Sequence, residues 1–201
     1  MNNEEIKKYC ERAFATHKAT LLQDTDRYCI IDWCRADGSG NCYVNYIVDK
    51  KRGSLIVSGD LGDSIATWFN AVTPAKLKGY IYNDVDYYIS KFQCASDQYT
   101  QNEDDVMEDI KSYIDDDELW DAFSESERCG FDTPEEMWEA VEDEVSSCIY
   151  GNKFIPSDRL SNLFPESWEW LSDCGKRTAL RCYMWAEGFY MACEQLGIGG
   201  A

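Results

Sequence analysis

The hydrophobic pattern predicts a β-meander early in the chain. Residues 28–35 (YCIIDWCR) and 41–48 (NCYVNYIV) are rich in β-branched and aromatic residues, and 54–58 (SLIVS) continues the pattern. Two turn sequences separate these segments, DGSGN at 37–41 and DKKRG at 49–53, and their residues tolerate positive φ. We therefore expect three antiparallel strands joined by short turns.

Helical spacing of apolar residues surrounds this meander. It predicts an amphipathic helix over residues 3–20 and a short helix over 60–69, capped by Asp60 or Asp63. A threonine–proline pair, typical of a helix start, opens a further helix over 73–81. Residues 84–93 (DVDYYISKFQ) fit a strand or a helix equally well.

The second half of the chain is predicted to be helical throughout. A polar, turn-rich stretch at 94–103 separates it from the first half. The expected fold is α+β, with a near-neutral α+β domain over 1–100 and an acidic all-helical domain over 101–201. This second domain ends in a long core helix, on which the acidic helices are expected to pack. The predicted helices after the boundary span 103–114, 115–123, 133–149, 157–164 and 166–196.

The negative charge of the chain is concentrated in its second half. The chain has a formal net charge of −19, and residues 101–150 alone hold 19 Asp and Glu against Lys111 and Arg128. Acidic residues in the first turn of a helix suit the helix dipole and need no functional explanation. The acidic residues of 139–144 lie late in their helix, where negative charge is unfavourable. Such a balance disfavours direct binding to nucleic acid or anionic membranes and favours a cationic partner or solubility.

Catalytic motifs are missing from the sequence. His17 is the only histidine, and no nucleophile motif, Walker loop, GxGxxG or HExxH is present. The acids of 115–118 are consecutive, unlike the alternating oxygen ligands of a calcium loop. Asp60 and Asp63 are the least implausible metal-binding pair, but helix capping explains them better. We expect no enzyme activity, no cofactor and no metal.

The ten cysteines form no CxxC pair, and the sequence lacks a plausible zinc ligand set. The N-terminal residues lack the apolar stretch of a signal peptide, and no apolar run approaches the ~20 residues of a membrane span. We therefore expect a cytoplasmic protein whose cysteines are mostly reduced, buried thiols.

The acidic helices are the candidate partner-binding surface. Carboxylates held in rows along packed helices can occupy a Lys/Arg-lined channel and release the counterions that nucleic acid would release. The alternative is a solvated acidic face that keeps the protein soluble. The candidate contact residues are Asp104, Asp105, Glu108, Asp109, Glu135, Glu139, Glu142 and Asp143.

Two stretches of the first half carry a resemblance. The runs 58–70 (SGDLGDSIATWFN) and 85–97 (VDYYISKFQCASD) resemble small proteins encoded by phages and prophages, among which are anti-CRISPR inhibitors of Cas9. The resemblance covers about residues 1–100, includes no catalytic motif and transfers no functional residue. It implies a phage-encoded protein acting in the cytoplasm of an infected bacterium. RNA-guided nucleases hold their duplex in a positively charged channel, which suits carboxylates as ligands.

The expected function is that of a non-enzymatic inhibitor of a bacterial nucleic-acid-targeting defence enzyme, with Cas9 as the leading candidate. One alternative is an acidic adaptor or scaffold that binds another basic partner in phage assembly or transcription. Another is a metal-dependent enzyme whose carboxylate ligands the sequence does not reveal.

Overall fold

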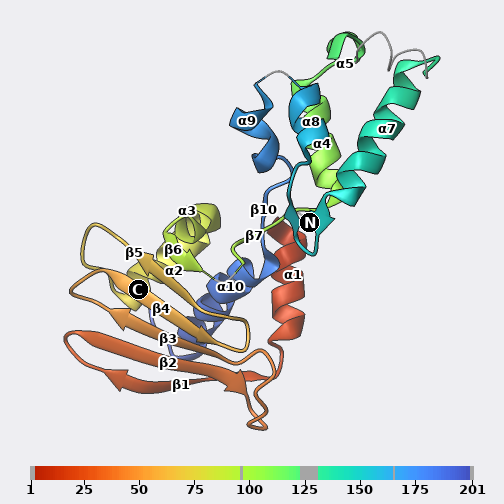
Figure 1. Cartoon of the computed structure of the whole chain (residues 1–201). Helices are drawn as coiled ribbons and strands as arrows, with labels where there is room; N and C mark the ends of the chain where they lie inside the picture. Colours follow the sequence, from red (N-terminus) through yellow and green to blue (C-terminus); the bar gives the residue numbers. More distant parts are fainter. Residues whose placement is uncertain (1–2, 96, 123–130, 165, 200–201) are drawn as a thin grey trace. The chain divides into compact units, whose positions relative to one another are not determined.

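The computed structural model describes residues 3–95, 97–122, 131–164 and 166–199 (Figure 1). The chain forms two compact units. Unit 1 comprises Met1–Gln98 and Ala179–Ala201, and unit 2 comprises Tyr99–Thr178. The fold is α+β, with an N-terminal helix and an antiparallel sheet in unit 1.

The sheet of unit 1 has six strands in the order β1-β2-β3-β4-β5-β6, and every neighbouring pair is antiparallel. The three predicted strands are confirmed as the second, third and fourth, but the expected three-stranded meander was wrong. The strands are β1 (His17–Asp24), β2 (Tyr28–Arg35), β3 (Val44–Asp49), β4 (Ser54–Gly59), β5 (Ser64–Thr67) and β6 (Phe92–Ala95).

Two of the extra strands lie where helices were expected. The N-terminal helix α1 (Asn3–Ala13) is shorter than predicted, because the chain turns at 14–16 and enters β1. The segment 60–69 forms β5, which is too short for its sequence pattern to separate a strand from a helix. Asp60 therefore caps no helix, and its carboxylate accepts a hydrogen bond from the backbone N–H of Cys42 at 2.8 Å.

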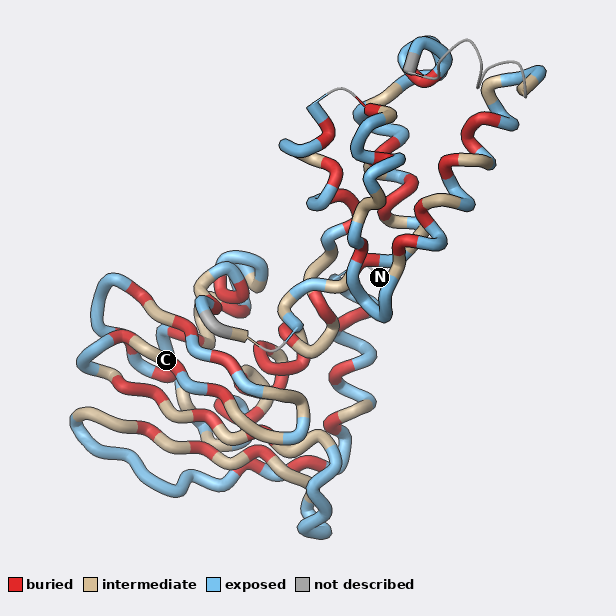
Figure 2. Tube along the Cα trace, viewed as in Figure 1, coloured by how far each residue is buried: buried red, intermediate tan, exposed pale blue. Residues whose placement is uncertain are grey.

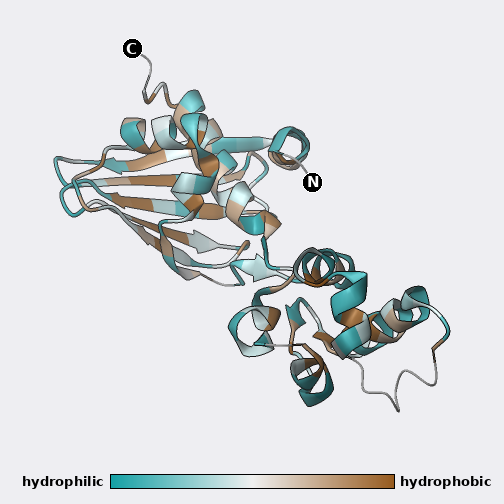
Figure 3. Cartoon of the chain, turned by 90° about the horizontal axis from the view of Figure 1, so that it is seen from above, coloured by the Kyte–Doolittle hydropathy of each residue, from teal (hydrophilic) through white to brown (hydrophobic). Residues whose placement is uncertain are grey.

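One face of the sheet packs against helices. α1, α2 (Pro74–Asn83), α3 (Val85–Ile89) and α10 (Leu180–Gln195) enclose a core with the inward side chains of the strands. Trp33 and Tyr46 from the sheet, and Trp185 and Phe189 from α10, are fully buried in this core. The strands carry much of the hydrophobic sequence of unit 1 (Figure 3).

The C-terminal helix differs from its prediction in length and in place. Residues 166–196 do not form one helix, because the chain is interrupted before α10 by α9 (Ser167–Trp170), the 3-10 helix η1 (Leu171–Asp173) and β10 (Arg177–Thr178). Gly175 allows the interruption with a φ of +71°, and a Cβ there would lie 2.8 Å from the backbone N of Val106. The last helix packs on the sheet and helices of unit 1, so the expected packing under the acidic helices was wrong.

Unit 2 is mainly helical, as predicted, with two short antiparallel strand pairs added. The N-caps follow the sequence: Asn102 accepts from Asp105 N at 2.9 Å, and Ser157 accepts from Leu160 N at 3.1 Å. The predicted helix end at Phe123 lies outside the described residues. The other elements of unit 2 are α4 (Glu103–Tyr113), α5 (Asp116–Ala122), α7 (Pro134–Ser147), α8 (Asp158–Leu163), β7 (Tyr99–Thr100), β8 (Ile149–Tyr150) and β9 (Lys153–Phe154).

Buried and exposed positions alternate along the helices of unit 2 with helical period (Figure 2). The apolar positions meet in a core of their own, which includes Val106, Ile110, Leu119, Met137 and Val141. Within the described ranges, no helix has the length and apolar character needed to cross a membrane.

Candidate functional site: the acidic helices of unit 2

The negative charge of the protein is concentrated in unit 2. This unit contains 23 Asp and Glu against 6 Lys and Arg, a net charge of −17, whereas unit 1 contains 15 against 13. All eight candidate contact residues lie on α4 and α7, which pack against each other. The structure divides these residues into two groups with different surroundings.

The first group lies on α7 and consists of Glu135, Glu139, Glu142 and Asp143, here called the α7 carboxylates. All four are exposed, while Met137, Val141 and Val145 turn into the core of unit 2. In the described part of the chain, no hydrogen bond or ion pair reaches any of the four side chains. A rise of 1.5 Å per residue spaces them over about 12 Å of helix axis. The α7 carboxylates thus form a row of solvated negative charges.

The two other acidic residues of α7 are engaged locally. Glu136 accepts a hydrogen bond from the backbone N–H of Asp132 at 2.6 Å and stabilises the start of the helix. Glu144 pairs with Arg159 of α8, with 3.4 Å between Oε2 and Nη1. The acidity of α7 therefore has a structural component, and the α7 carboxylates are separate from it.

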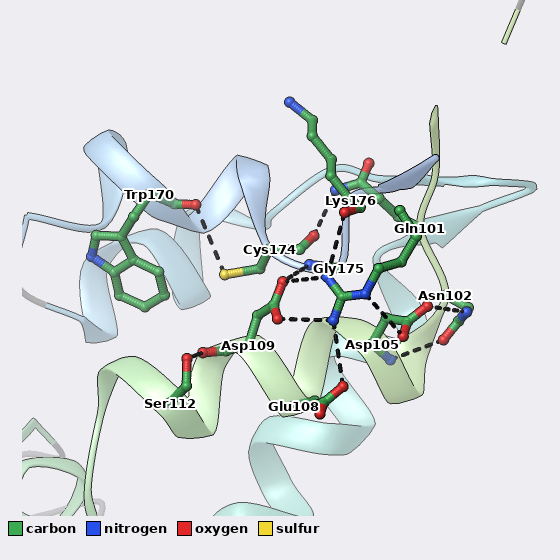
Figure 4. A network of polar contacts seen from close by, with 11 residues as sticks. Gln101, Asn102, Asp105, Glu108, Asp109, Ser112, Trp170, Cys174, Gly175 and Lys176 are labelled. Atoms are coloured by element: carbon green, nitrogen blue, oxygen red, sulfur yellow. Dashed lines mark hydrogen bonds and ion pairs between the residues drawn. The ribbon is translucent and has the colours of Figure 1, made fainter. Parts of the chain in front are cut away.

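The second group lies on α4, where Arg177 of β10 pairs with three of the four candidate acids, Asp105, Glu108 and Asp109 (Figure 4). Its Nη1 and Nη2 each donate to one oxygen of Asp109 at 2.9 Å, a forked arrangement typical of strong arginine–carboxylate pairs. Its Nε lies 3.3 Å from Asp105 and its Nη2 lies 3.4 Å from Glu108. Asp109 also accepts from the backbone N–H of Gly175 at 2.6 Å.

These contacts shift the proton affinities of the pair. The hydrogen bonds from Arg177 lower the pKa of the Asp109 carboxyl, and the same bonds raise the pKa of the guanidinium. Both groups are therefore charged at neutral pH. Asp104 is the exception on this helix, because its side chain is exposed and pairs with none of the residues that the structure describes.

A buried glutamine holds the segment that carries Arg177 next to α4. Gln101 donates from Nε2 to the carbonyl oxygens of Cys174, at 2.7 Å, and Ser172, at 3.2 Å, and its Oε1 accepts from Phe154 N at 3.2 Å. These bonds fix the segment before Arg177 beside the start of α4. Sequence reasoning missed both Gln101 and Arg177. The one signal in the sequence that could have drawn attention to Arg177 was the scarcity of basic residues near the acidic stretch.

The other residues considered for chemistry have structural surroundings. His17 is buried, its Nε2 lies 3.2 Å from the carbonyl oxygen of Cys42, and burial lowers its pKa. The eight cysteines with described side chains are free, and burial raises the pKa of Cys10, Cys182 and Cys193 to about 12. Among the described residues, no three His, Cys, Asp or Glu side chains are grouped to hold a metal ion.

The candidate site is thus a set of exposed carboxylates on α7, with Asp104 of α4, and its chemistry is electrostatic. Comparison of the chain with protein-family models, with curated proteins and with solved structures found no match.

Proposed function

We propose that the protein is a non-enzymatic inhibitor that places its acidic helices on a basic, nucleic-acid-binding surface of a partner protein. The leading candidate partner is an RNA-guided nuclease of the Cas9 kind, in the cytoplasm of a bacterium infected by a phage that encodes the inhibitor. The observation that carries the proposal is the row of α7 carboxylates, exposed and without a cation of their own in the described chain.

The spacing of this row suits a surface built for nucleic acid. Four charges over about 12 Å of helix axis give one charge per about 4 Å. One strand of B-DNA presents a phosphate every ~3.4 Å along its axis. Lys and Arg side chains arranged for phosphates therefore meet carboxylates at a similar interval, and both ligands release the same counterions.

The ion pairs of α4 reduce the number of acidic residues that are available to a partner protein. Asp105, Glu108 and Asp109 share Arg177, so a partner cation would have to compete with an internal one. In the described part of the chain, no internal cation is paired with the α7 carboxylates or with Asp104. We therefore assign the main contacts to these five residues, and we assign to the other three a mainly structural role.

The test is a charge-reversal variant, Glu135→Lys, Glu139→Lys, Glu142→Lys and Asp143→Lys, assayed for inhibition of Cas9 DNA cleavage. The parent should bind the nuclease free of DNA and lose affinity steeply as salt rises. An exposed ion pair contributes up to about 1 kcal/mol, so losing four, with added repulsion, should weaken inhibition at least about a hundredfold.

The matched control reverses four exposed acids of unit 1, Glu5→Lys, Glu11→Lys, Asp26→Lys and Asp63→Lys, and reaches the same net charge. It should inhibit nearly as well as the parent. Equal inhibition by both variants would contradict the proposal. Binding that is unchanged when the nuclease already holds its DNA would favour the adaptor, and metal-dependent turnover would favour an enzyme.

A further inference from the structure

Unit 1 contains a cleft of about 330 Å³ between α1, α10 and the junction of α2 with α3. Three tyrosines and three carboxylates line it, together with a single base. The residues that matter for its chemistry are Lys7, Tyr82, Asp86, Tyr183, Glu187 and Tyr190. It belongs to unit 1 alone and contains none of the acidic residues discussed above.

A carboxylate without a partner lies in the wall of this cleft. Glu187 of α10 is only partly exposed, and no hydrogen bond or ion pair reaches it from any residue that the structure describes. Burial raises the pKa of its carboxyl, Lys7 acts in the opposite direction, and Glu11 raises it further. A partly desolvated carboxylate without a donor is costly, so a cation bound beside it would be favourable.

Aromatic rings form the rest of the wall. Tyr82 and Tyr190 are stacked, with ring centroids 6.5 Å apart and an interplanar angle of 16°. Tyr82 is 75% exposed, which leaves its ring available to a ligand. Tyr190 already attracts a cation of the protein itself, since Lys78 Nζ lies 5.4 Å from its ring centroid.

Three other polar side chains of the cleft are engaged within the fold. The hydroxyl of Tyr183 donates to Asp86 Oδ1 at 3.1 Å, and Asp84 caps α3 by accepting from Tyr87 N at 2.9 Å. Both carboxylates still contribute negative charge. With Glu187 they outnumber Lys7 by three to one, so the cleft is acidic although unit 1 as a whole is close to neutral.

We propose that this cleft binds a small organic cation, an alkylguanidinium or alkylammonium, with its charged head beside Glu187 and its stem along Tyr82 and Tyr190. The volume lies at the lower end of the ~300–1,000 Å³ typical of small-molecule sites, which suits one such group and its short stem. The aromatic faces and the carboxylate both favour a cation, and an anionic ligand would meet repulsion from both. This inference stands apart from the function proposed for unit 2.

The test is a titration of the full-length protein, followed by amide chemical shifts, with n-butylguanidinium, n-pentylammonium and the neutral n-butylurea. The two cations should give saturable shifts at the cleft, with dissociation constants on the order of 1 mM. Butylurea has the shape of butylguanidinium without its charge and should bind at least about tenfold more weakly. The two cations distinguish a guanidinium site from an ammonium site.

Two variants and two controls complete the experiment. Glu187→Gln removes the charge with little change in shape, Tyr82→Ala removes the exposed ring, and each should weaken cation binding at least about tenfold. Asp26→Asn and Tyr150→Ala remove a charge and an exposed ring elsewhere and should leave binding unchanged. Equal binding of butylurea, unchanged binding by both cleft variants, or shifts confined to the acidic helices of unit 2 would each overturn the proposal.

Discussion

Arg177 determines what the acidic residues of α4 do. Asp105 and Asp109 lie one helical turn apart, where like charges repel, and a single guanidinium between them turns this repulsion into attraction. The forked bond to Asp109 also joins β10 to α4. Asp105, Glu108 and Asp109 of α4 therefore differ from the α7 carboxylates in having Arg177 as a partner.

The Asp109 pair predicts a pH-dependent stability. Because Arg177 lowers the pKa of Asp109 in the folded state, the stabilisation is present above the unfolded-state pKa of ~3.9 and is lost as pH falls through the lower folded-state value. At pH 7, Asp109→Asn should lower the free energy of unfolding by about 1–2 kcal/mol, a value limited by the partial exposure of the pair. Urea unfolding measured between neutral pH and pH ~3 tests this.

The matched control for this prediction is Asp104→Asn, at the exposed acid of α4 that has no partner among the described residues. It should leave the free energy of unfolding unchanged at neutral pH. The difference between the two variants should also shrink as the pH approaches 3. Equal effects of the two substitutions at pH 7 would show that the Arg177 pair contributes no stability.

At the scale of elements, the best predictions concern helix starts. The threonine–proline pair at 73–74 was assigned as a helix start from sequence, and the helices predicted to begin at 103 and 157 have Asn102 and Ser157 as their N-caps. Thr73, Asn102 and Ser157 each accept a backbone hydrogen bond from three residues ahead. Capping involves four consecutive residues, so a local pattern is sufficient to find it. The strands β1 and β5 were missed for another reason. The helical spacing of apolar residues over 3–20 runs into β1, and β5 has only four residues, too few for its pattern to separate a strand from a helix.

The contact between α10 and the sheet depends on one glycine. A Cβ at Gly188 would lie 2.6 Å from the hydroxyl oxygen of Tyr46, which donates to the carbonyl oxygen of Trp185 at 2.9 Å. A glycine permits this close approach because it has no Cβ. The partner in that approach is a buried tyrosine, which the sequence did not identify.

Gly188→Ala should therefore destabilise the protein by about 1–3 kcal/mol, although alanine is favoured over glycine in helices by about 1 kcal/mol. Tyr46→Phe removes the oxygen that the new methyl group would meet. In the double variant, the cost of Gly188→Ala should fall by at least about 1 kcal/mol, measured as a double-mutant cycle from urea unfolding.

Gly79→Ala is the control for this cycle. Gly79 lies within α2, and a Cβ there would meet no atom within 4 Å, so the substitution should stabilise the protein. Additive effects of Gly188→Ala and Tyr46→Phe would contradict the contact described here.

At the scale of the whole molecule, the two units differ in charge by far more than in size. Repulsion within unit 2 is strongest at low ionic strength, where charges interact over longer distances. Raising NaCl from about 10 mM to about 0.5 M should increase amide protection in α4 and α7 more than in β2–β4, because salt screens this repulsion. Hydrogen exchange followed by mass spectrometry resolves the two units peptide by peptide.

The variant Glu135→Gln, Glu139→Gln, Glu142→Gln and Asp143→Gln is the control for the salt effect. It removes the solvated row and leaves Glu136 and Glu144 with their partners. Its α7 peptides should be better protected than the parent's at low salt and should change less as salt rises. A salt response of equal size in both units would show that net charge does not limit the stability of unit 2.

The sequence by itself determined the features that depend on neighbouring residues. These are the strands β2, β3 and β4, the helix N-caps and the place of the acidic stretch, because turns, caps and periodicity are complete within a few residues. The same reasoning identified the acids of 139–144 as lacking a local structural explanation, and these include three of the four α7 carboxylates.

Only the tertiary structure decided which distant segments meet. It added β1, β5 and β6 to the sheet, placed α10 on that sheet, and brought Arg177 to the acids of α4. It also brought α1, α10 and the α2–α3 junction together around Glu187. The physical reason is that burial of a surface and pairing of a charge both depend on a second segment that contacts it. A sequence pattern describes each segment but does not identify the segment that it contacts.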